Sequence, residues 1–148
     1  MENKPKQICI HKSGYGFQDA EGIKKYHLSK GWRDIGYHYV IQKDGTLQEG
    51  RPVGMKPAHA SGHNDDVIAI CVIGEFCKDE PSEAQINQLK FLILNLCKEH
   101  HIDTSMHQIF CHADYRDKPG NRFCPGKYLH RQIPSIANWV RQMIQKGA

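Results

Sequence analysis

The apolar residues of this chain group into short runs that predict strands. Residues 67–74 are apolar or glycine at every position, a pattern that predicts a central strand covered on both faces. Shorter apolar runs at 7–11 and 108–112 predict two further strands, each of which ends in a histidine. The aromatic and β-branched run at 37–43 leads into an Asp-Gly-Thr turn at 44–46, which predicts a β-hairpin.

Positions spaced three and four residues apart predict helices that cover these strands. One helix is expected over 18–30, opening near Asp19. A second begins at the capping box of Ser82 and Gln85, and its inner face contains Ile86, Leu89, Ile93, Leu96, Cys97 and His100. A third begins at Pro134, with Ile136, Trp139, Val140, Met143 and Ile144 on one face. The pattern predicts an α/β protein: one domain with a central mixed β-sheet flanked by helices.

Composition agrees with an ordinary globular domain over residues 1–148. The chain is 39% hydrophobic and 24% charged, and its net charge of +4 is modest and spread out, so nucleic acid is not expected as a partner. We expect a monomer. We also expect no membrane insertion, because no apolar run is long enough to cross a bilayer. Residues 1–7 are polar and lack the apolar region of a signal peptide, which predicts synthesis in the cytoplasm.

Three side chains form a possible zinc site. His11 and His112 each end an apolar strand, and Cys124 lies in a later loop. A catalytic zinc typically has three protein ligands of these types and a fourth position for water, whereas a structural zinc would need a fourth protein ligand. A thiol enzyme in which Cys124 or Cys111 attacks is a rival hypothesis. The six cysteines show no C-x-x-C pairing, and we expect most of them to be reduced and buried.

The chain resembles a known family through an ordered set of motifs. These are I-C-I-H (8–11), G-W-R-D-I-G-Y-H-Y-V-I-Q-K-D-G-T (31–46), H-A-S-G-H-N (59–64), I-A-I-C-V-I-G-E-F (68–76), C-H (111–112) and C-P-G (124–126). They are similar to the type 2 N-acetylmuramoyl-L-alanine amidases, which include phage lysozyme-type amidases and animal peptidoglycan recognition proteins. The resemblance spans about residues 7–146. It implies a single zinc amidase domain that cuts the amide between the lactyl group of N-acetylmuramic acid and the L-alanine of the stem peptide, in peptidoglycan or muropeptides.

The resemblance also implies a role for individual residues. His11, His112 and Cys124 fall on the family's ligand positions for one Zn²⁺ per chain. Tyr37 matches a tyrosine beside the metal, whose phenol could donate a hydrogen bond to the developing oxyanion. His59 and Asn64 match residues that line the groove and contact the substrate.

One position departs from the family pattern. Two residues before the ligand cysteine, where many active members have lysine or threonine, this chain has Arg122. Arginine cannot release a proton at working pH, so it could stabilise negative charge but could not act as a general acid. Lys118, Lys127 and Glu75 are weaker candidates for acid or base chemistry.

Two other questions stay open at this point. A module that binds peptidoglycan without cutting it is the rival from another class, and it would typically lack a metal ligand. The biological setting could be a phage or prophage endolysin, which acts on the wall after release from the cytoplasm, or a cytosolic amidase that recycles muropeptides.

Overall fold

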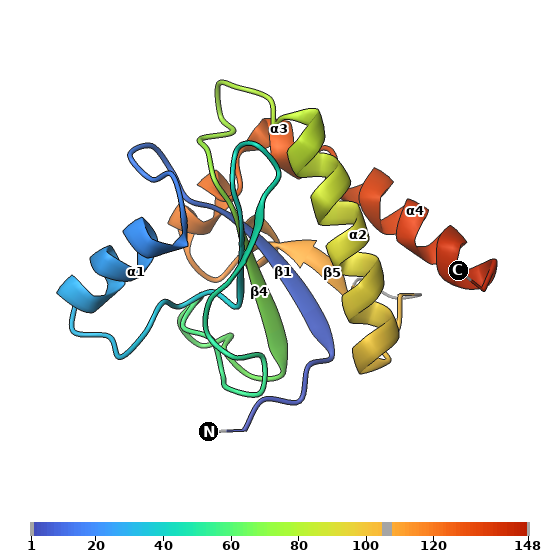
Figure 1. Cartoon of the computed structure of the whole chain (residues 1–148), viewed down its shortest axis with the longest axis horizontal. Helices are drawn as coiled ribbons and strands as arrows, with labels where there is room; N and C mark the ends of the chain where they lie inside the picture. Colours follow the sequence, from blue (N-terminus) through green and yellow to red (C-terminus); the bar gives the residue numbers. More distant parts are fainter. Residues whose placement is uncertain (1, 105–107, 148) are drawn as a thin grey trace.

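The strands form one mixed sheet, as the sequence predicts. The structure is a computed structural model that describes residues 2–104 and 108–147. Within these residues the sheet has the strand order β3-β2-β4-β1-β5. Figure 1 labels three of its strands, β4, β1 and β5. Its strands are β1 (Gln7–Lys12), β2 (Tyr39–Ile41), β3 (Leu47–Glu49), β4 (Val67–Val72) and β5 (Ile109–Cys111). All neighbouring pairs are parallel except β2 and β3, which form the predicted antiparallel hairpin.

Helices cover both faces of the sheet. Figure 1 shows α1 on one side and α2 with α4 on the other. The helices are α1 (Ala20–Ser29), α2 (Glu83–His100), α3 (Lys127–His130) and α4 (Ile133–Gln145), with two short 3-10 helices, η1 (His112–Asp114) and η2 (Pro119–Phe123). None of the described helices is long and apolar enough to cross a membrane.

The central strand β4 explains why its sequence is apolar at every position. Ile68 and Ile70 pack into the core formed with α2 and α4, whereas Cys71 packs into a second cluster with Ile23 of α1. Because successive side chains of a strand point to opposite faces, both faces of β4 are buried. The prediction of a central strand covered on both sides is therefore confirmed.

Local signals set the helix starts. The capping box is present: the Ser82 side chain accepts a hydrogen bond from the Gln85 N–H, and the Gln85 side chain accepts one from the Ser82 N–H. Asp19 caps α1 by accepting from the Gly22 N–H at 2.9 Å. The predicted strand 37–43 is shorter than expected, since β2 covers only Tyr39–Ile41.

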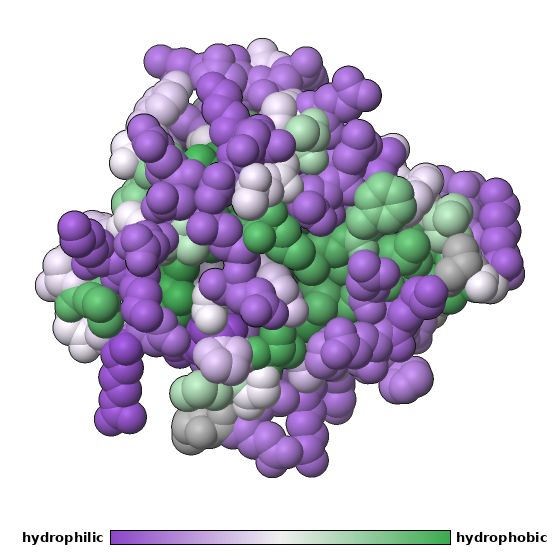
Figure 2. Space-filling model, in the orientation of Figure 1, coloured by the Kyte–Doolittle hydropathy of each residue, from purple (hydrophilic) through white to green (hydrophobic). Residues whose placement is uncertain are grey.

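The surface is mostly hydrophilic. Figure 2 shows that apolar side chains gather on this face over α2 and α4. Phe91 of α2 is 54% exposed, and its ring lies 5.5 Å from that of Trp139 on α4. These two helices pack against each other as well as against the sheet.

Candidate metal centre

Two neighbouring strands bring the predicted histidines together. β1 and β5 are parallel partners, so their carboxyl ends lie at the same edge of the sheet. His11 lies near the end of β1 and His112 follows β5 directly, and the centroids of their rings are 4.7 Å apart. Cys124 follows η2 and reaches the same place. His11, His112 and Cys124 each offer a ligand atom, and these atoms all lie within 4.8 Å of one another.

The spacing of these donors fits one zinc ion. Cys124 Sγ lies 3.6 Å from His11 Nδ1. Zinc binds sulfur at about 2.3 Å and nitrogen at about 2.0–2.1 Å, so two such ligands of a tetrahedral ion are roughly 3.6 Å apart. Burial, followed by the nearby His59 and His112, holds the pKa of His11 well below its usual value, which keeps the ring in the neutral form that binds metals.

The Cys124 thiol is weakly acidic in this environment. Burial raises the pKa of Cys124 to about 11, although the Lys12 backbone N–H, which donates to Sγ at 3.3 Å, opposes the rise. Burial likewise raises the pKa of Cys111 to about 12. Without a metal both sulfurs are therefore thiols at neutral pH, and a thiol enzyme would need a neighbouring base to activate either of them.

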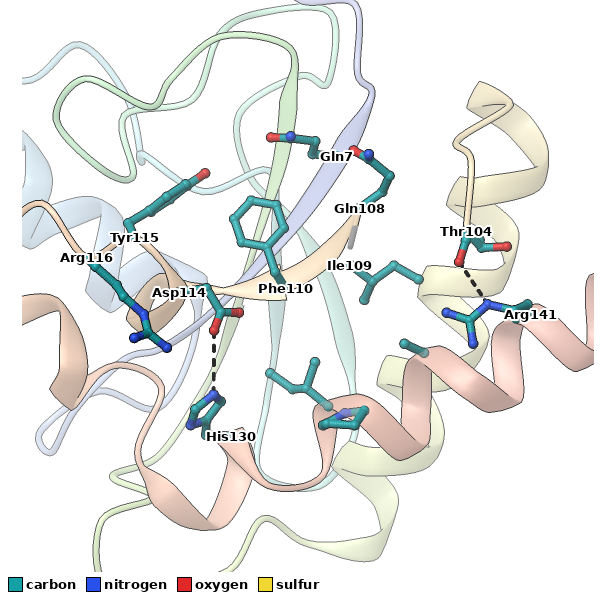
Figure 3. A pocket seen from close by; sticks show the side chains of 13 residues that line it. Gln7, Thr104, Gln108, Ile109, Phe110, Asp114, Tyr115, Arg116, His130 and Arg141 are labelled. Carbon is teal, nitrogen blue, oxygen red and sulfur yellow. Dashed lines mark hydrogen bonds and ion pairs between the residues drawn. The ribbon is translucent and has the colours of Figure 1, made fainter. Parts of the chain in front are cut away.

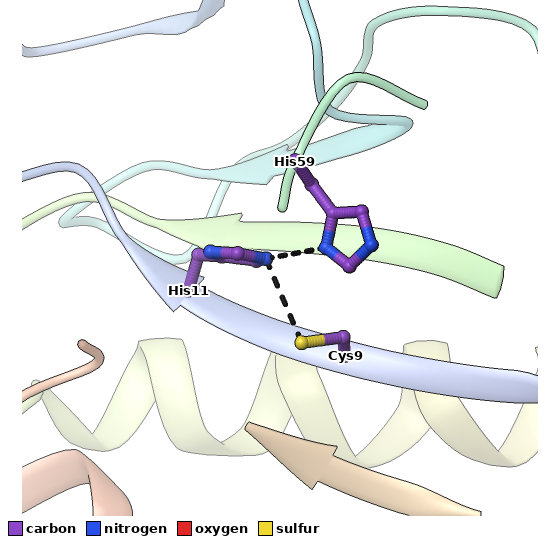
Figure 4. A group of neighbouring side chains, drawn as sticks. All are labelled: Cys9, His11 and His59. Carbon is purple, nitrogen blue, oxygen red and sulfur yellow. Dashed lines mark hydrogen bonds between the residues drawn. The ribbon is translucent and has the colours of Figure 1, made fainter. Parts of the chain in front are cut away.

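A chain of hydrogen bonds fixes which nitrogen of His11 is protonated, and Figure 4 shows its link between His11 and His59. His59 Nε2 lies 2.7 Å from the His63 carbonyl oxygen, which can only accept, so Nε2 carries a proton. Burial lowers the pKa of His59 to about 4, so its ring is neutral and Nδ1 is an acceptor. His11 Nε2 therefore donates to His59 Nδ1 at 2.8 Å. His11 Nδ1 is therefore unprotonated, and its lone pair faces Cys124, whose thiol can donate to it at 3.6 Å.

A second grouping, Cys9 with His11 and His59, does not fit a shared ion. Its ligand atoms are also close together. However, His11 Nε2 and His59 Nδ1 are 2.8 Å apart, which is shorter than the roughly 3.3 Å between two nitrogen ligands of a tetrahedral zinc. The distance is that of a hydrogen bond. We therefore assign His59 to the support of His11.

Tyr37 lies beside the cluster. Its ring centroid is 5.2 Å from that of His11. Burial, with the nearby Cys71, Cys124 and Cys9, holds the pKa of Tyr37 well above its usual value, so the phenol stays protonated and can donate a hydrogen bond.

Gly36 allows the loop that carries His59 to approach Tyr37. A Cβ at Gly36 would lie 2.1 Å from the Ala58 carbonyl oxygen, so only glycine permits this close contact. The Ala58 N–H also donates to the Gly36 carbonyl at 3.0 Å. His59 follows directly and is thereby directed towards His11.

Comparison with known proteins identifies the family. A family model described as N-acetylmuramoyl-L-alanine amidase matches residues 1–127. The chain belongs to this amidase family. Peptidoglycan-recognition protein SC2 of Drosophila melanogaster is 32% identical over 120 residues, which cover 80% of this chain and 62% of that protein. The endolysin of Escherichia phage T7 is 40% identical over 52 residues, 35% of this chain and 34% of the endolysin. The matched region thus spans less than two thirds of these relatives.

Solved structures show the same fold. N-acetylmuramoyl-L-alanine amidase LysC from Clostridium intestinale superposes with a TM-score of 0.80 at 28% identity, covering 92% of this chain and 87% of LysC. Drosophila PGRP-LB superposes with a TM-score of 0.76 at 28% identity, covering 91% of this chain and 82% of that one. The family and the α/β fold expected from the motifs are confirmed.

In this amidase-family chain, Asn64 makes its contacts within the loop. Its side-chain oxygen accepts hydrogen bonds from the backbone N–H groups of His59 at 3.0 Å and Ala60 at 3.2 Å. The amide thus closes the turn from which His59 projects. The contacts seen for His59 and Asn64 are therefore internal to the protein.

Arg122 lies in η2, two residues before Cys124, and is exposed. Its guanidinium lies over the Phe123 ring, 4.8 Å from the centroid. The weaker candidates have other partners: Glu75 forms an ion pair with Lys12, and the Lys127 ammonium lies 5.2 Å from the Tyr128 ring centroid.

The sequence reasoning missed Lys12. Its backbone N–H contacts Cys124 Sγ, and its ammonium lies between Glu75 and Cys77 Sγ, 3.5 Å from the sulfur. Adjacency to His11 was the only signal in the sequence, and it does not predict a contact 112 residues away.

Proposed function

We propose that the chain is a zinc-dependent N-acetylmuramoyl-L-alanine amidase that hydrolyses the bond between the lactyl group of N-acetylmuramic acid and the L-alanine of the stem peptide. The cluster of His11, His112 and Cys124 carries this proposal, because its donors and the 3.6 Å spacing of Sγ and Nδ1 suit one Zn²⁺ with a fourth position left over. When bound there, zinc would lower the pKa of a water molecule to about 7 and polarise the amide carbonyl.

The surrounding residues would orient and stabilise the reacting groups. His59 would hold the His11 ring with Nδ1 unprotonated, and Asn64 would hold the loop that presents His59. We propose that both serve substrate binding through the shape of this loop. The protonated Tyr37 phenol would donate a hydrogen bond to the oxygen on which negative charge develops. Arg122 would add positive charge near the same edge without transferring a proton.

The similarity to phage endolysins supports a role in lysis from inside a bacterium. We propose that the chain acts as one monomeric catalytic domain on peptidoglycan, made in the cytoplasm and reaching the wall after release. The similarity to peptidoglycan recognition proteins keeps the binding module as the rival function, but all three proposed ligands are present here. Cleavage of soluble muropeptides in the cytosol would instead indicate a recycling enzyme.

One assay separates these functions. Purified protein is incubated with insoluble wall and with soluble muropeptides, with and without a chelator, and new L-alanine amino termini are identified by mass spectrometry. We expect release that the chelator abolishes and added zinc restores. A zinc-loaded sample that binds muropeptide but releases no stem peptide would establish the binding module. Activity that survives the chelator and is lost on thiol alkylation would establish a thiol enzyme.

A further inference from the structure

A second cluster of metal-binding side chains lies beside a large cavity at the free edge of the sheet. The cavity has a volume of about 730 Å³ and is bordered by β5 and the first turns of α4 (Figure 3). Asp114 and His130 line it, and their side chains point towards each other. Cys111 of β5 lies behind Asp114, with its sulfur 3.4 Å from Asp114 Oδ2.

This cluster is separate from the proposed amidase site. Cys111 belongs to the core that Ile8 and Ile10 form with α2 and α4. His112, the next residue, packs its ring against His11 at the end of the neighbouring strand. Consecutive residues at the end of β5 therefore supply donors to two different places.

We propose that Cys111, Asp114 and His130 form a second site, which takes a divalent cation of the zinc type. Their ligand atoms all lie within 4.8 Å of one another, with Asp114 Oδ1 3.7 Å from His130 Nε2. Thiolate, carboxylate and imidazole ligands of a tetrahedral zinc are roughly 3.3–3.6 Å apart, so small side-chain movements would complete the site. The mixture of sulfur, nitrogen and oxygen donors selects zinc or cobalt over magnesium or calcium.

The local structure holds two of the donors in place. Asp114 Oδ2 also accepts a hydrogen bond from the Cys111 N–H at 3.0 Å, which fixes the carboxylate next to the thiol. His130 ends α3, and its N–H donates to the Gly126 carbonyl at 2.8 Å. A cation could enter through the cavity, because the side chains of His130 and Asp114 are 49% and 45% exposed. As the metal–sulfur bond forms, the Cys111 thiol proton would pass to water.

The position of the second site gives it a structural consequence. Asp114 lies two residues after His112, and His130 lies six residues after Cys124. A cation held by both would tie together the two ends of the segment that carries two of the three proposed zinc ligands. The second site does not depend on amide hydrolysis, since a chain without amidase activity would bind the cation equally.

Metal stoichiometry tests the proposal without substrate. Metal-free protein is titrated with Zn²⁺, and the ions bound per chain are counted by native mass spectrometry. We expect two ions per chain in the wild type. In His130→Ala the second ion should bind at least about tenfold more weakly than in the wild type, a loss that even outer-shell partners can produce. At zinc concentrations that just fill both sites of the wild type, this variant should hold one ion. His101→Asn is the matched control, since it removes a histidine from the left-handed end of α2 and should still bind two.

Cobalt spectroscopy identifies the ligands. In Cys124→Ser, Co²⁺ should still give a thiolate charge-transfer band, and adding His130→Ala should remove it. Saturation of the wild type at one zinc per chain would overturn the proposal, as would an unchanged second ion in His130→Ala. Either result leaves the amide-cleavage assay unaffected, so the two proposals fail separately.

Discussion

The proposed zinc ligands come from two regions of different character. His11 lies in β1, which pairs with β4 on one side and β5 on the other. His11 is only 1% exposed. Cys124 ends the segment 112–124, which consists of short 3-10 helices and turns with mostly exposed residues. The strand end is positioned by a ladder and a packed core. The segment must be positioned by individual contacts, and its ligands should be easier to displace.

Side-chain contacts position this segment. Asn121 is the one residue of the segment 112–124 that is buried, and its amide donates to the Tyr115 carbonyl at 2.9 Å and to Asp117 at 3.2 Å. Gly126 brings the end of the segment against Phe76, where a Cβ would lie 2.4 Å from the backbone. The His63 ring also pairs with Asp117 at 3.0 Å and stacks on Tyr115. Such contacts take the place of the strand pairing that positions His11.

The largest expected effect comes from removing a proposed ligand from either region. His11→Ala and Cys124→Ser should each lower amidase activity by more than the roughly 10²–10³-fold that loss of one oxyanion donor causes. Their stabilities should differ, since His11→Ala leaves a cavity in packed structure and Cys124→Ser does not. Turnover with added zinc and urea unfolding of the metal-free proteins measure these two effects. Equal losses of stability would contradict the contrast between the two regions.

Tyr37→Phe tests the packed region for a chemical role. The change removes one hydroxyl and should lower kcat by about 10²–10³-fold, because it removes one donor to the developing charge. Zinc content should be unchanged, since the phenol is not among the proposed ligands. Steady-state kinetics with a metal assay on the same sample measures both quantities. Unchanged turnover would show that Tyr37 only packs against His11.

His59→Ala tests whether the strand end alone orients His11. Loss of the acceptor for His11 Nε2 should weaken zinc binding by about 10–100-fold, the range found for outer-shell partners. His101→Asn is the control, because it removes an exposed histidine from the C-terminal end of α2. His59→Asn, which keeps an acceptor near the position of Nδ1, should recover part of the affinity. Competition with a chromophoric chelator measures all three variants, and equal affinities for His59→Ala and His101→Asn would remove the proposed role.

The contrast also explains what could be predicted from the sequence. The apolar run of β4 and the capping box at Ser82 are local patterns, and both appear in the structure as expected. The motif residues His11, His112 and Cys124 could be named and are brought together. The contacts that hold these residues in place could not be predicted, because the contacts of Asn121 and Lys12 leave no periodic pattern in the sequence.

His59 illustrates the same limit. The family resemblance implies a substrate contact for His59 but gives no sign of a contact with His11. The close contact of Gly36 with Ala58 positions the loop so that His59 meets His11. A contact between backbones 22 residues apart determines this, and the sequence of either segment alone does not reveal it.

Two variants with a similar expected loss of unfolding free energy, one in each region, sharpen the contrast. Ile70→Val in the core should cost about 0.5–1.5 kcal/mol, and Asn121→Ala should cost about 1 kcal/mol for its lost hydrogen bonds. Only Asn121→Ala should weaken zinc binding, by roughly tenfold, because it frees the segment that carries His112 and Cys124. Urea unfolding and zinc titration of both variants test this. An equal loss of zinc affinity in Ile70→Val would mean that the site responds to global stability.

The last expected effect is a pH dependence of stability on the packed side, through His27. This residue of α1 is 6% exposed, packs on Trp32, and accepts a hydrogen bond from the Gly36 N–H at Nδ1. Burial, then the nearby Lys30 and Arg51, lowers the pKa of His27 from 6.5 to about 4. Between these values the unfolded chain binds a proton that the folded chain does not, so stability falls as the pH drops from about 6.5 towards 4.

We expect His27 to contribute about 1–3 kcal/mol to this fall. His27→Asn keeps an acceptor for Gly36 without titrating, so its free energy of unfolding should depend less steeply on pH. Urea unfolding of the metal-free proteins at pH 7 and pH 4.5 measures the difference, with His101→Asn as the control for an exposed histidine. Since Gly36 holds the loop of His59 in place, protonation of His27 should also loosen the support of His11 before the core unfolds. A slope in His27→Asn equal to that of the wild type would show that the acid sensitivity arises from other groups.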